Sequence, residues 1–266
     1  MSTTCHNDIQ AMPIRPFELR EFFHLAFLRH LGLRLSGRSY AVKGGICLRF
    51  FHRSPRLSQD MDLDIANQVR VETLGKAIDT ILESRAFSAS LTSQGINRIR
   101  WTKPKQTETT QRWKISLSVS ENSPLHTKIE FSRRYEKVSY STGVPSSEIL
   151  DCYKMIPFAV QFYDALSMTL QKISALASPS RHAARDLFDL HHLLRGVLVK
   201  PEQFHNKIHQ MNLERAAEKI SQFSFQDFKG QVLPYLSGNL IDAYGNPKAF
   251  EQLKAEVEEV LLKILQ

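Results

Sequence analysis

The sequence predicts an α/β (α+β) protein, with a mixed-sheet domain at residues 1–150 followed by a helical domain at residues 151–266. Three observations lead to this prediction. The length of 266 residues is enough for one large domain or two modest ones. Segments with helical spacing of apolar residues alternate in the first half with short strand-like runs. From about residue 158 onward the periodicity is nearly all helical, interrupted by glycines and prolines.

The first half begins with a predicted helix at residues 16–35, where the apolar side chains recur every three or four positions. A short strand at 39–43 then enters the glycine pair Gly44–Gly45. We predict a second helix at 46–51, an alternating strand at 60–66 and a third helix at 71–87. Three more strands are predicted at 96–101, 112–119 and 125–131, with the polar segment 102–110 connecting the first two.

The second half is predicted to contain five helices, at 160–177, 183–194, 201–211, 213–223 and 249–265. The sequence contains no run of about 18 apolar residues, so no membrane span is expected. The N-terminal segment lacks a basic region followed by an apolar core, so no secretory signal is expected. The three cysteines, Cys5, Cys47 and Cys152, are too scattered for a zinc site or a disulfide framework. We therefore expect a cytoplasmic protein without a membrane partner.

The chain is basic, with 35 Lys and Arg residues against 27 acidic residues and a net charge of +8, which favours a polyanionic partner such as nucleic acid. The excess is dense between residues 97 and 114, a segment that also contains both tryptophans, Trp101 and Trp113. Basic residues interleaved with aromatic ones suit phosphate contacts and base stacking. An ordinary amphipathic hairpin would have the same pattern, so both interpretations stay open. The candidate nucleic-acid-binding residues are Arg98, Arg100, Lys103 and Lys105.

Three aspartates alternate with apolar residues in "DMDLDI": Asp60, Asp62 and Asp64. On a strand, residues two apart share a face, so these carboxylates project together about 6–7 Å apart. Such like charges raise one another's pKa unless a cation lies among them, and Mg²⁺ suits an open oxygen-rich cluster. Glu130 could complete the cluster if its strand lies alongside. The alternative is a solvated strand edge decorated with acids.

An EF-hand loop also begins DxDxD, but it requires Gly at position six and Glu at position twelve. Here those positions are Ile65 and Val71, which excludes a calcium loop of this kind. Gly44 and Gly45 stand between a strand-like and a helix-like run, where glycines let backbone N–H groups approach a phosphate. A glycine pair alone is usually just a turn. Followed about fifteen residues later by an acidic strand, it predicts a phosphate cradle beside a metal site.

The stretch "VKGGICLRFF…RLSQDMDLDI" resembles the opening motif of the AbiEii-type nucleotidyltransferase toxins, which are part of the polymerase-beta-like nucleotidyltransferase superfamily. The matching residues are Lys43, Gly44, Gly45, Leu48, Arg56, Ser58, Asp60 and Asp62. A later stretch, "QKISALASPSRHAARDLFDLHHLL", resembles the family's second signature through Lys172, Arg181, Arg185, Asp186 and Asp189. It departs from the family by a gap two residues longer before the Arg-Asp pair, and Glu130 stands where family members more often have Asp.

The resemblance implies a nucleotidyltransferase domain followed by a helical domain, with the active site between them. The implied catalytic residues are Asp60, Asp62, Lys172 and Asp186, and the implied metal ligands for Mg²⁺ are Asp60, Asp62 and Glu130. The implied nucleotide-binding residues are Lys43, Gly44, Gly45, Ser58 and Lys172. The implied reaction transfers a nucleoside monophosphate from an NTP to RNA, with the acceptor end of tRNA favoured, by a toxin whose partner is a cognate antitoxin.

Several residues keep a second interpretation. Lys172 could be a solvent-facing helix lysine, and Asp189 is more simply explained by an ion pair with Arg185 four residues away. Ser58 could orient the acidic strand or cap its turn, and Asp186 could hold Lys172 or a substrate hydroxyl. Two other functions also remain open for the whole protein, namely nucleotidylation of a protein side chain and a catalytically silent nucleic-acid-binding or partner-binding module.

Overall fold

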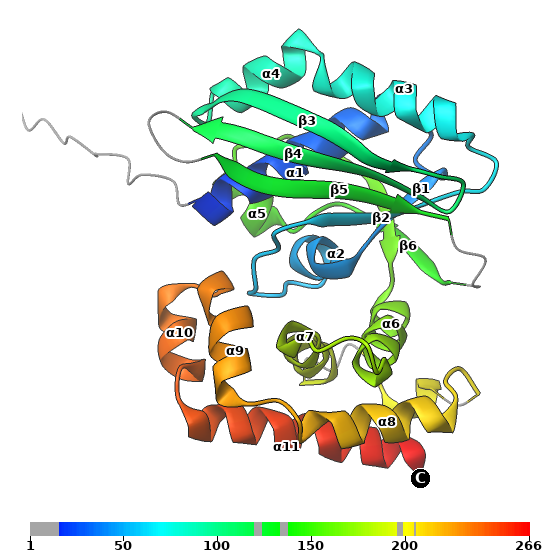
Figure 1. Cartoon of the computed structure of the whole chain (residues 1–266), viewed down its shortest axis with the longest axis vertical. Helices are drawn as coiled ribbons and strands as arrows, with labels where there is room; N and C mark the ends of the chain where they lie inside the picture. The colour runs from blue at the N-terminus through cyan, green and yellow to red at the C-terminus, as the bar shows by residue number, and fades with distance from the viewer. Residues whose placement is uncertain (1–15, 120–123, 134–137, 196–198, 205) are drawn as a thin grey trace, which may run out of the picture.

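The computed structural model of the chain describes residues 16–119, 124–133, 138–195, 199–204 and 206–266. Residues 1–15, which include Cys5 and most of the segment in which no secretory signal was expected, lie outside this description. The described residues form a mixed β-sheet with helices on it and a separate group of helices below it (Figure 1).

The elements follow one another along the chain with short connections. In order they are α1 (Pro16–Gly32), β1 (Tyr40–Lys43), α2 (Gly44–Phe51), β2 (Met61–Ile65), α3 (Val71–Leu82), α4 (Arg85–Thr92), β3 (Ile96–Gln106), β4 (Thr110–Val119), β5 (Leu125–Ser132), β6 (Tyr140–Gly143), α5 (Ser147–Cys152), β7 (Val160–Tyr163), α6 (Ala165–Ala177), α7 (Ala184–Arg195), η1 (Pro201–Phe204), α8 (Gln210–Ile220), α9 (Phe225–Gln231), η2 (Leu233–Tyr235), α10 (Gly238–Tyr244) and α11 (Pro247–Leu265).

The seven-stranded sheet has the order β3-β4-β5-β2-β1-β7-β6. The pairs β2–β5 and β1–β7 are parallel, and the other neighbouring pairs are antiparallel, so the sheet is mixed as predicted. The register places Asp62 beside Glu130 across β2 and β5, and Lys43 beside Asp62 across β1 and β2. Three residues from distant parts of the sequence thereby meet in the middle of the sheet.

One face of the β3–β4–β5 part of the sheet is covered by α1, α3 and α4 (Figure 1). The side chains of β4 that face these helices alternate with partly exposed ones, and Trp113, Ile115 and Leu117 are almost fully buried. Trp113 packs edge-on against Phe131 of β5. The apolar alternation of these strands therefore forms the core of the first half, and the burial of Trp113 matches the amphipathic-hairpin interpretation for that residue.

Helices α6 to α11 form the second group, and α6 and α7 lie between the sheet and the long helices α8 and α11 (Figure 1). Their apolar faces meet in a second core that includes Phe188, Phe228 and Phe250, all with at most 1% of their surface exposed. α6 and α7 therefore present their other faces toward the sheet.

Three predicted helices differ from the structure. Residues 71–87 form two helices, because Ser84 begins α4 by accepting a hydrogen bond from the Phe87 N–H. Residues 160–163 form β7, because this β-branched and aromatic run pairs with β1 and β6 before α6 begins at Ala165. At 201–211 a short 3₁₀ helix ends at Phe204, and α8 begins at Gln210.

The division of the chain at residue 150 stays a prediction, and the sheet takes its strand β7 from beyond that position. The two buried cores meet in sequence around α6, since Met168 packs in the first core and Ile173 in the second. Among the residues that the structure describes, no helix combines the length and the apolar character needed to cross a bilayer.

Candidate active site

A cavity of about 730 Å³ opens between the sheet and the helices α6 and α7. Its lining comes mainly from β1, the start of α2, the α2–β2 loop, β2, β5, β7, α6 and α7. All the residues predicted as catalytic, metal-binding or nucleotide-binding line this one cavity: Lys43, Gly44, Gly45, Ser58, Asp60, Asp62, Glu130, Lys172 and Asp186. The tertiary structure thus brings together residues up to 143 positions apart in the sequence.

Asp60 and Asp62 stand at the floor of the cavity, just before and within β2, with 32% and 37% of their side chains exposed. Asp60 is oriented by the backbone N–H of Lys128, which donates to its Oδ1 at 3.1 Å. Glu130 reaches the same group from β5, as expected if its strand lay alongside, and accepts a hydrogen bond from Arg112. Three carboxylates therefore converge at the junction of β2 and β5.

The ammonium of Lys128 lies among these carboxylates, 3.5 Å from Asp60, 4.0 Å from Asp62 and 3.9 Å from Glu130. One cation thus lies within 4.0 Å of all three acids. The three carboxylates together favour a positive charge at this position, as the ligands of a divalent ion must.

Among the described residues, no group of three or more His, Cys, Asp and Glu side chains is arranged to hold a metal ion by itself. Mg²⁺ usually takes one or two protein carboxylates and completes its octahedron with water and substrate phosphates. Asp60 and Asp62 fit that pattern, with Glu130 next to them. The limited solvation of Asp62 within the cavity raises the pKa of its carboxyl; the Glu130 and Asp60 charges raise this pKa further, and the Lys128 and Lys43 charges lower it.

The two glycines are needed for close packing against this acidic group. Gly44 has φ of +68°, and a Cβ there would lie 2.9 Å from Oδ2 of Asp62. A Cβ on Gly45 would lie 2.6 Å from Oγ of Ser58. The N-cap residue of α2, Lys43, makes no side-chain hydrogen bond to the first turn. The start of α2 therefore presents bare backbone to the cavity, as a phosphate cradle requires.

Two of the remaining motif residues take structural partners at the cavity wall. The Ser58 hydroxyl donates to the carbonyl of Asp60 at 3.0 Å, a contact that fits both of its interpretations, orienting the acidic segment and capping its turn. The Lys43 ammonium donates to Asp64 and Ser132 and is almost fully buried. Asp64 shares the strand face of Asp62 but is buried behind it, where the Lys43 charge neutralises it.

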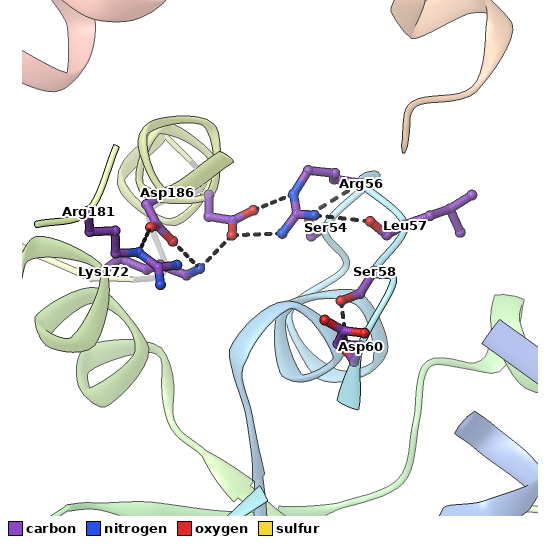
Figure 2. A network of polar contacts seen from close by, with 9 residues as sticks. Ser54, Arg56, Leu57, Ser58, Asp60, Lys172, Arg181 and Asp186 are labelled. Carbon is purple, nitrogen blue, oxygen red and sulfur yellow. Dashed lines mark hydrogen bonds and ion pairs between the residues drawn. The ribbon is translucent and has the colours of Figure 1, made fainter. Parts of the chain in front are cut away.

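A buried network of charges forms the opposite wall of the cavity (Figure 2). Lys172 on α6 donates to Asp186 at 2.8 Å, and its ammonium is 2.7 Å from Asp189; both acids are on α7. Arg181 donates to the second oxygen of Asp186. Burial acts to lower the pKa of Lys172, but the two carboxylates outweigh it and raise this pKa above the ordinary value. Lys172 is therefore a charged residue of the cavity wall, and Asp186 holds it there.

Asp189 is the residue whose role the spacing analysis missed. It is completely buried, and Arg56 of the α2–β2 loop binds it through two hydrogen bonds of 2.8 Å each. The preferred interpretation, an ion pair with Arg185 four residues away, is wrong, because the carboxylate pairs with Arg56 and Lys172 instead. The available signal was helical periodicity, because Asp189 and Asp186 fall on the apolar face that Leu190 and Leu193 continue. A charge on a buried face requires a buried partner.

The Arg56–Asp189 pair connects the two halves of the molecule directly beside the cavity, which Arg56 lines. The same loop is attached to the helical half at a second point, since the Leu57 N–H donates to the Tyr235 carbonyl at 2.9 Å. Tyr235 also donates through its hydroxyl to Gln59 at 2.9 Å. The loop that leads into Asp60 and Asp62 is therefore attached to the helical half at two places, α7 and η2.

The predicted nucleic-acid-binding residues lie apart from the cavity lining. Arg98, Arg100, Lys103 and Lys105 are exposed on β3, at the edge of the sheet farthest from β6.

The family model described as "Nucleotidyl transferase AbiEii toxin, Type IV TA system" matches residues 26–259. The chain belongs to this AbiEii family. It is accordingly a nucleotidyltransferase, of a family of type IV toxins whose membership implies an antitoxin partner and a nucleotide substrate. Nucleotidyltransferases in general use divalent metal ions, which agrees with the carboxylate pair.

Solved structures share the fold of this AbiEii-family chain at low sequence identity. JHP933 from Helicobacter pylori is 17% identical, with 95% of this chain and 93% of that chain covered and a TM-score of 0.53. A putative nucleotidyltransferase from H. pylori is 18% identical, with 92% and 93% covered and a TM-score of 0.52. MenT4, nucleotidyltransferase toxin Rv2826c from Mycobacterium tuberculosis H37Rv, is 14% identical, with 94% and 89% covered and a TM-score of 0.54. No curated protein matches the chain.

Proposed function

We propose that this AbiEii-family protein transfers a nucleoside monophosphate from an NTP to the 3′ end of an RNA acceptor, with tRNA as the favoured acceptor. The observation that carries the proposal is the cavity itself. It has an acidic pair on the sheet side and a cluster of cations on the helical side, and its volume of about 730 Å³ is in the usual range for ligand sites. A triphosphate between the two walls would meet the cations of the helical side, and a metal ion held by the acidic pair would supply positive charge on the sheet side.

On the helical wall, the cations with exposed side chains are Arg181, Arg185 and Lys207. Lys172 adds a fourth positive charge, already held by Asp186 and Asp189. On the sheet wall, the glycine pair at the start of α2 offers backbone N–H groups. We assign the triphosphate to the space between these groups, because each would stabilise phosphate charge.

In the proposed reaction, the 3′-hydroxyl oxygen of the acceptor forms a bond to the α-phosphorus. The bond from that phosphorus to the bridging oxygen breaks, pyrophosphate leaves with the electron pair, and the hydroxyl proton passes to water. Asp60 and Asp62, with Glu130 beside them, would hold Mg²⁺, which supplies charge stabilisation at the attacking and leaving oxygens. The protein residues position the two substrates and neutralise charge, without a covalent intermediate.

As a type IV toxin the protein would act in the cytoplasm by modifying the RNA on which translation depends, and a cognate antitoxin would restrain it. The basic balance of the chain supports a polyanionic acceptor. RNA is preferred to a protein acceptor because the basic strand β3 belongs to the same sheet as the cavity floor.

The proposal is tested by incubating the protein with total RNA, Mg²⁺ and each α-labelled NTP in turn. We expect label in tRNA-sized RNA, and a loss of at least about 100-fold with Asp62→Asn, because that change removes one of the two charges that would hold the metal. Asp151→Asn is the matched control, since Asp151 is an exposed carboxylate on α5 that does not line the cavity. Label on protein instead of RNA would show that the acceptor is a protein side chain. Folded protein that labels neither would refute the proposal.

A further inference from the structure

The face of β3, β4 and β5 that is opposite α1, α3 and α4 is rich in basic side chains. The register identifies its members, because Trp101 and Ile99 pair with Ile115 and Leu117, whose side chains are buried against the helices. The residues between them point the other way. Six basic side chains share this open face: Arg98, Arg100, Lys105, Arg112, Lys114 and Lys128.

Lys103 belongs to the opposite side, although it is adjacent in sequence to the others. Its ammonium donates to Asp79 of α3 at 2.6 Å, on the helix-covered face. An irregularity in the β3–β4 register between Thr102 and Lys105 returns Lys105 to the open face, where it pairs with Arg112. The four residues predicted as nucleic-acid-binding therefore divide into three on the open face and one behind it.

Four of the six basic residues of the open face stand opposite one another on neighbouring strands, although Glu130 offsets Arg112, and the acidic group of the cavity offsets Lys128. Lys114 is directly opposite Lys128, and Lys105 is directly opposite Arg112. Like charges in such cross-strand positions destabilise a sheet. The sequences of β3, β4 and β5 contain one acid, Glu130, to offset them. An arrangement that is unfavourable for the isolated sheet becomes favourable when a polyanion lies across it.

This basic face begins at the acidic pair. Lys128 lies within 4.0 Å of Asp60 and Asp62, and the sheet order β2-β5-β4-β3 carries the line outward to Arg100. Three steps between neighbouring strands, of about 4.8 Å each, span about 14 Å. That length accommodates the last few nucleotides of a single strand.

We propose that this face is the track that binds the phosphates of the last nucleotides of a single-stranded RNA 3′ end and leads its terminal hydroxyl to Asp60 and Asp62. The proposal rests on the proposed function and specifies its acceptor site. A nucleic-acid strand is the fitting occupant because its regular phosphates match a line of cations that ends at the reaction centre. Phosphate contact is the mode of binding, since Trp113 is fully buried and Trp101 packs against the core on the helix-covered face, so neither stacks on a base at the open face.

The test measures binding of a fluorescent single-stranded RNA oligonucleotide by anisotropy over a range of salt concentrations. The variant Arg100→Ala/Lys114→Ala removes one exposed charge of the track from β3 and one from β4. The control Lys103→Ala removes a charge of β3 from the opposite face. We expect the double variant to bind at least about tenfold more weakly at low salt, with a salt slope smaller by about 1.4, because each lost phosphate contact contributes about 0.7. Lys103→Ala should bind as the unsubstituted protein does.

An unchanged affinity and slope in the double variant, or an equal loss in Lys103→Ala, would overturn the track. Matching thermal melts of all three proteins would show that the comparison concerns folded molecules. Label transfer from an NTP to the same oligonucleotide separates the two proposals. Transfer with an unchanged KM for RNA in the double variant refutes the track alone. Track-dependent binding without any transfer by the unsubstituted protein refutes the proposed function alone.

Discussion

Replacing Asp189 by Asn should destabilise the protein strongly, and the effect can be estimated from the buried network. Asp189 has no exposed side-chain surface, and it meets Arg56 at 2.8 Å and Lys172 at 2.7 Å. The side chains of these two cations are 5% and 8% exposed. The substitution leaves Arg56 without a carboxylate and Lys172 with Asp186 alone. Removing one partner of a buried ion pair typically costs about 3–5 kcal/mol.

The cost of leaving Arg56 buried and unpaired can be separated from the net contribution of the Arg56–Asp189 pair to stability. In the double variant Arg56→Leu/Asp189→Leu, neither charge of the pair remains, and Lys172 keeps Asp186. Replacement of a buried pair by apolar residues is often close to neutral. We therefore expect the double variant to lose less stability than Asp189→Asn, with a coupling between the two sites of at least about 2 kcal/mol.

Urea unfolding followed by circular dichroism measures both quantities. Arg56 and Lys172 lower the pKa of Asp189 well below its ordinary value despite its burial. The carboxylate therefore contributes stability above the unfolded pKa of about 3.9, and this contribution is lost as the pH falls toward the folded value. The gap between wild type and Asp189→Asn should persist at pH 5 and narrow only below about pH 4. A loss under about 1 kcal/mol at pH 7 would refute the reasoning.

Two other predictions follow from single sites. Gly45→Ala should abolish nucleotide-dependent thermal stabilisation, because its Cβ would lie 2.6 Å from Ser58 Oγ at the phosphate cradle. Gly75→Ala in α3 is the control, because a Cβ there meets nothing within 4 Å; it should raise the unfolding free energy by about 0.5–1 kcal/mol and keep the response to nucleotide. Differential scanning fluorimetry measures the shift in melting temperature on adding nucleotide, and an equal shift in the two variants would contradict this prediction. Burial, and secondarily Arg20, lowers the pKa of His24 to about 3, so the unfolded chain takes up a proton that the folded one does not. His24 should therefore contribute about 2 kcal/mol to the fall in stability from pH 7.5 to 5, and His24→Gln should remove that contribution from the urea-derived profile; an unchanged pH dependence in the variant would show that other groups account for the fall.

Much of the site was predictable because its members are close together in the sequence. The glycine pair and the alternating aspartates lie within about twenty residues, so a strand–turn–helix unit with a nearby second strand brings them together with little tertiary information. Glu130 needed one further condition, that its strand lie beside β2, which the sheet order confirms. The prediction failed for Asp189, because a local i,i+4 partner was available in the sequence while the actual partner is 133 residues away.

The sequence alone determined the alternation of strands and helices, the family motifs and the basic balance, since these depend on periodicity and on residue types at short spacing. Only the tertiary structure decided which charges meet. Whether a lysine of β3 faces the open side or α3 depends on one irregularity in the strand register, which separates Lys103 from Lys105. Whether Asp189 is exposed or buried depends on how α7 packs against the α2–β2 loop. Both outcomes are set by contacts between distant segments, where local spacing carries no information.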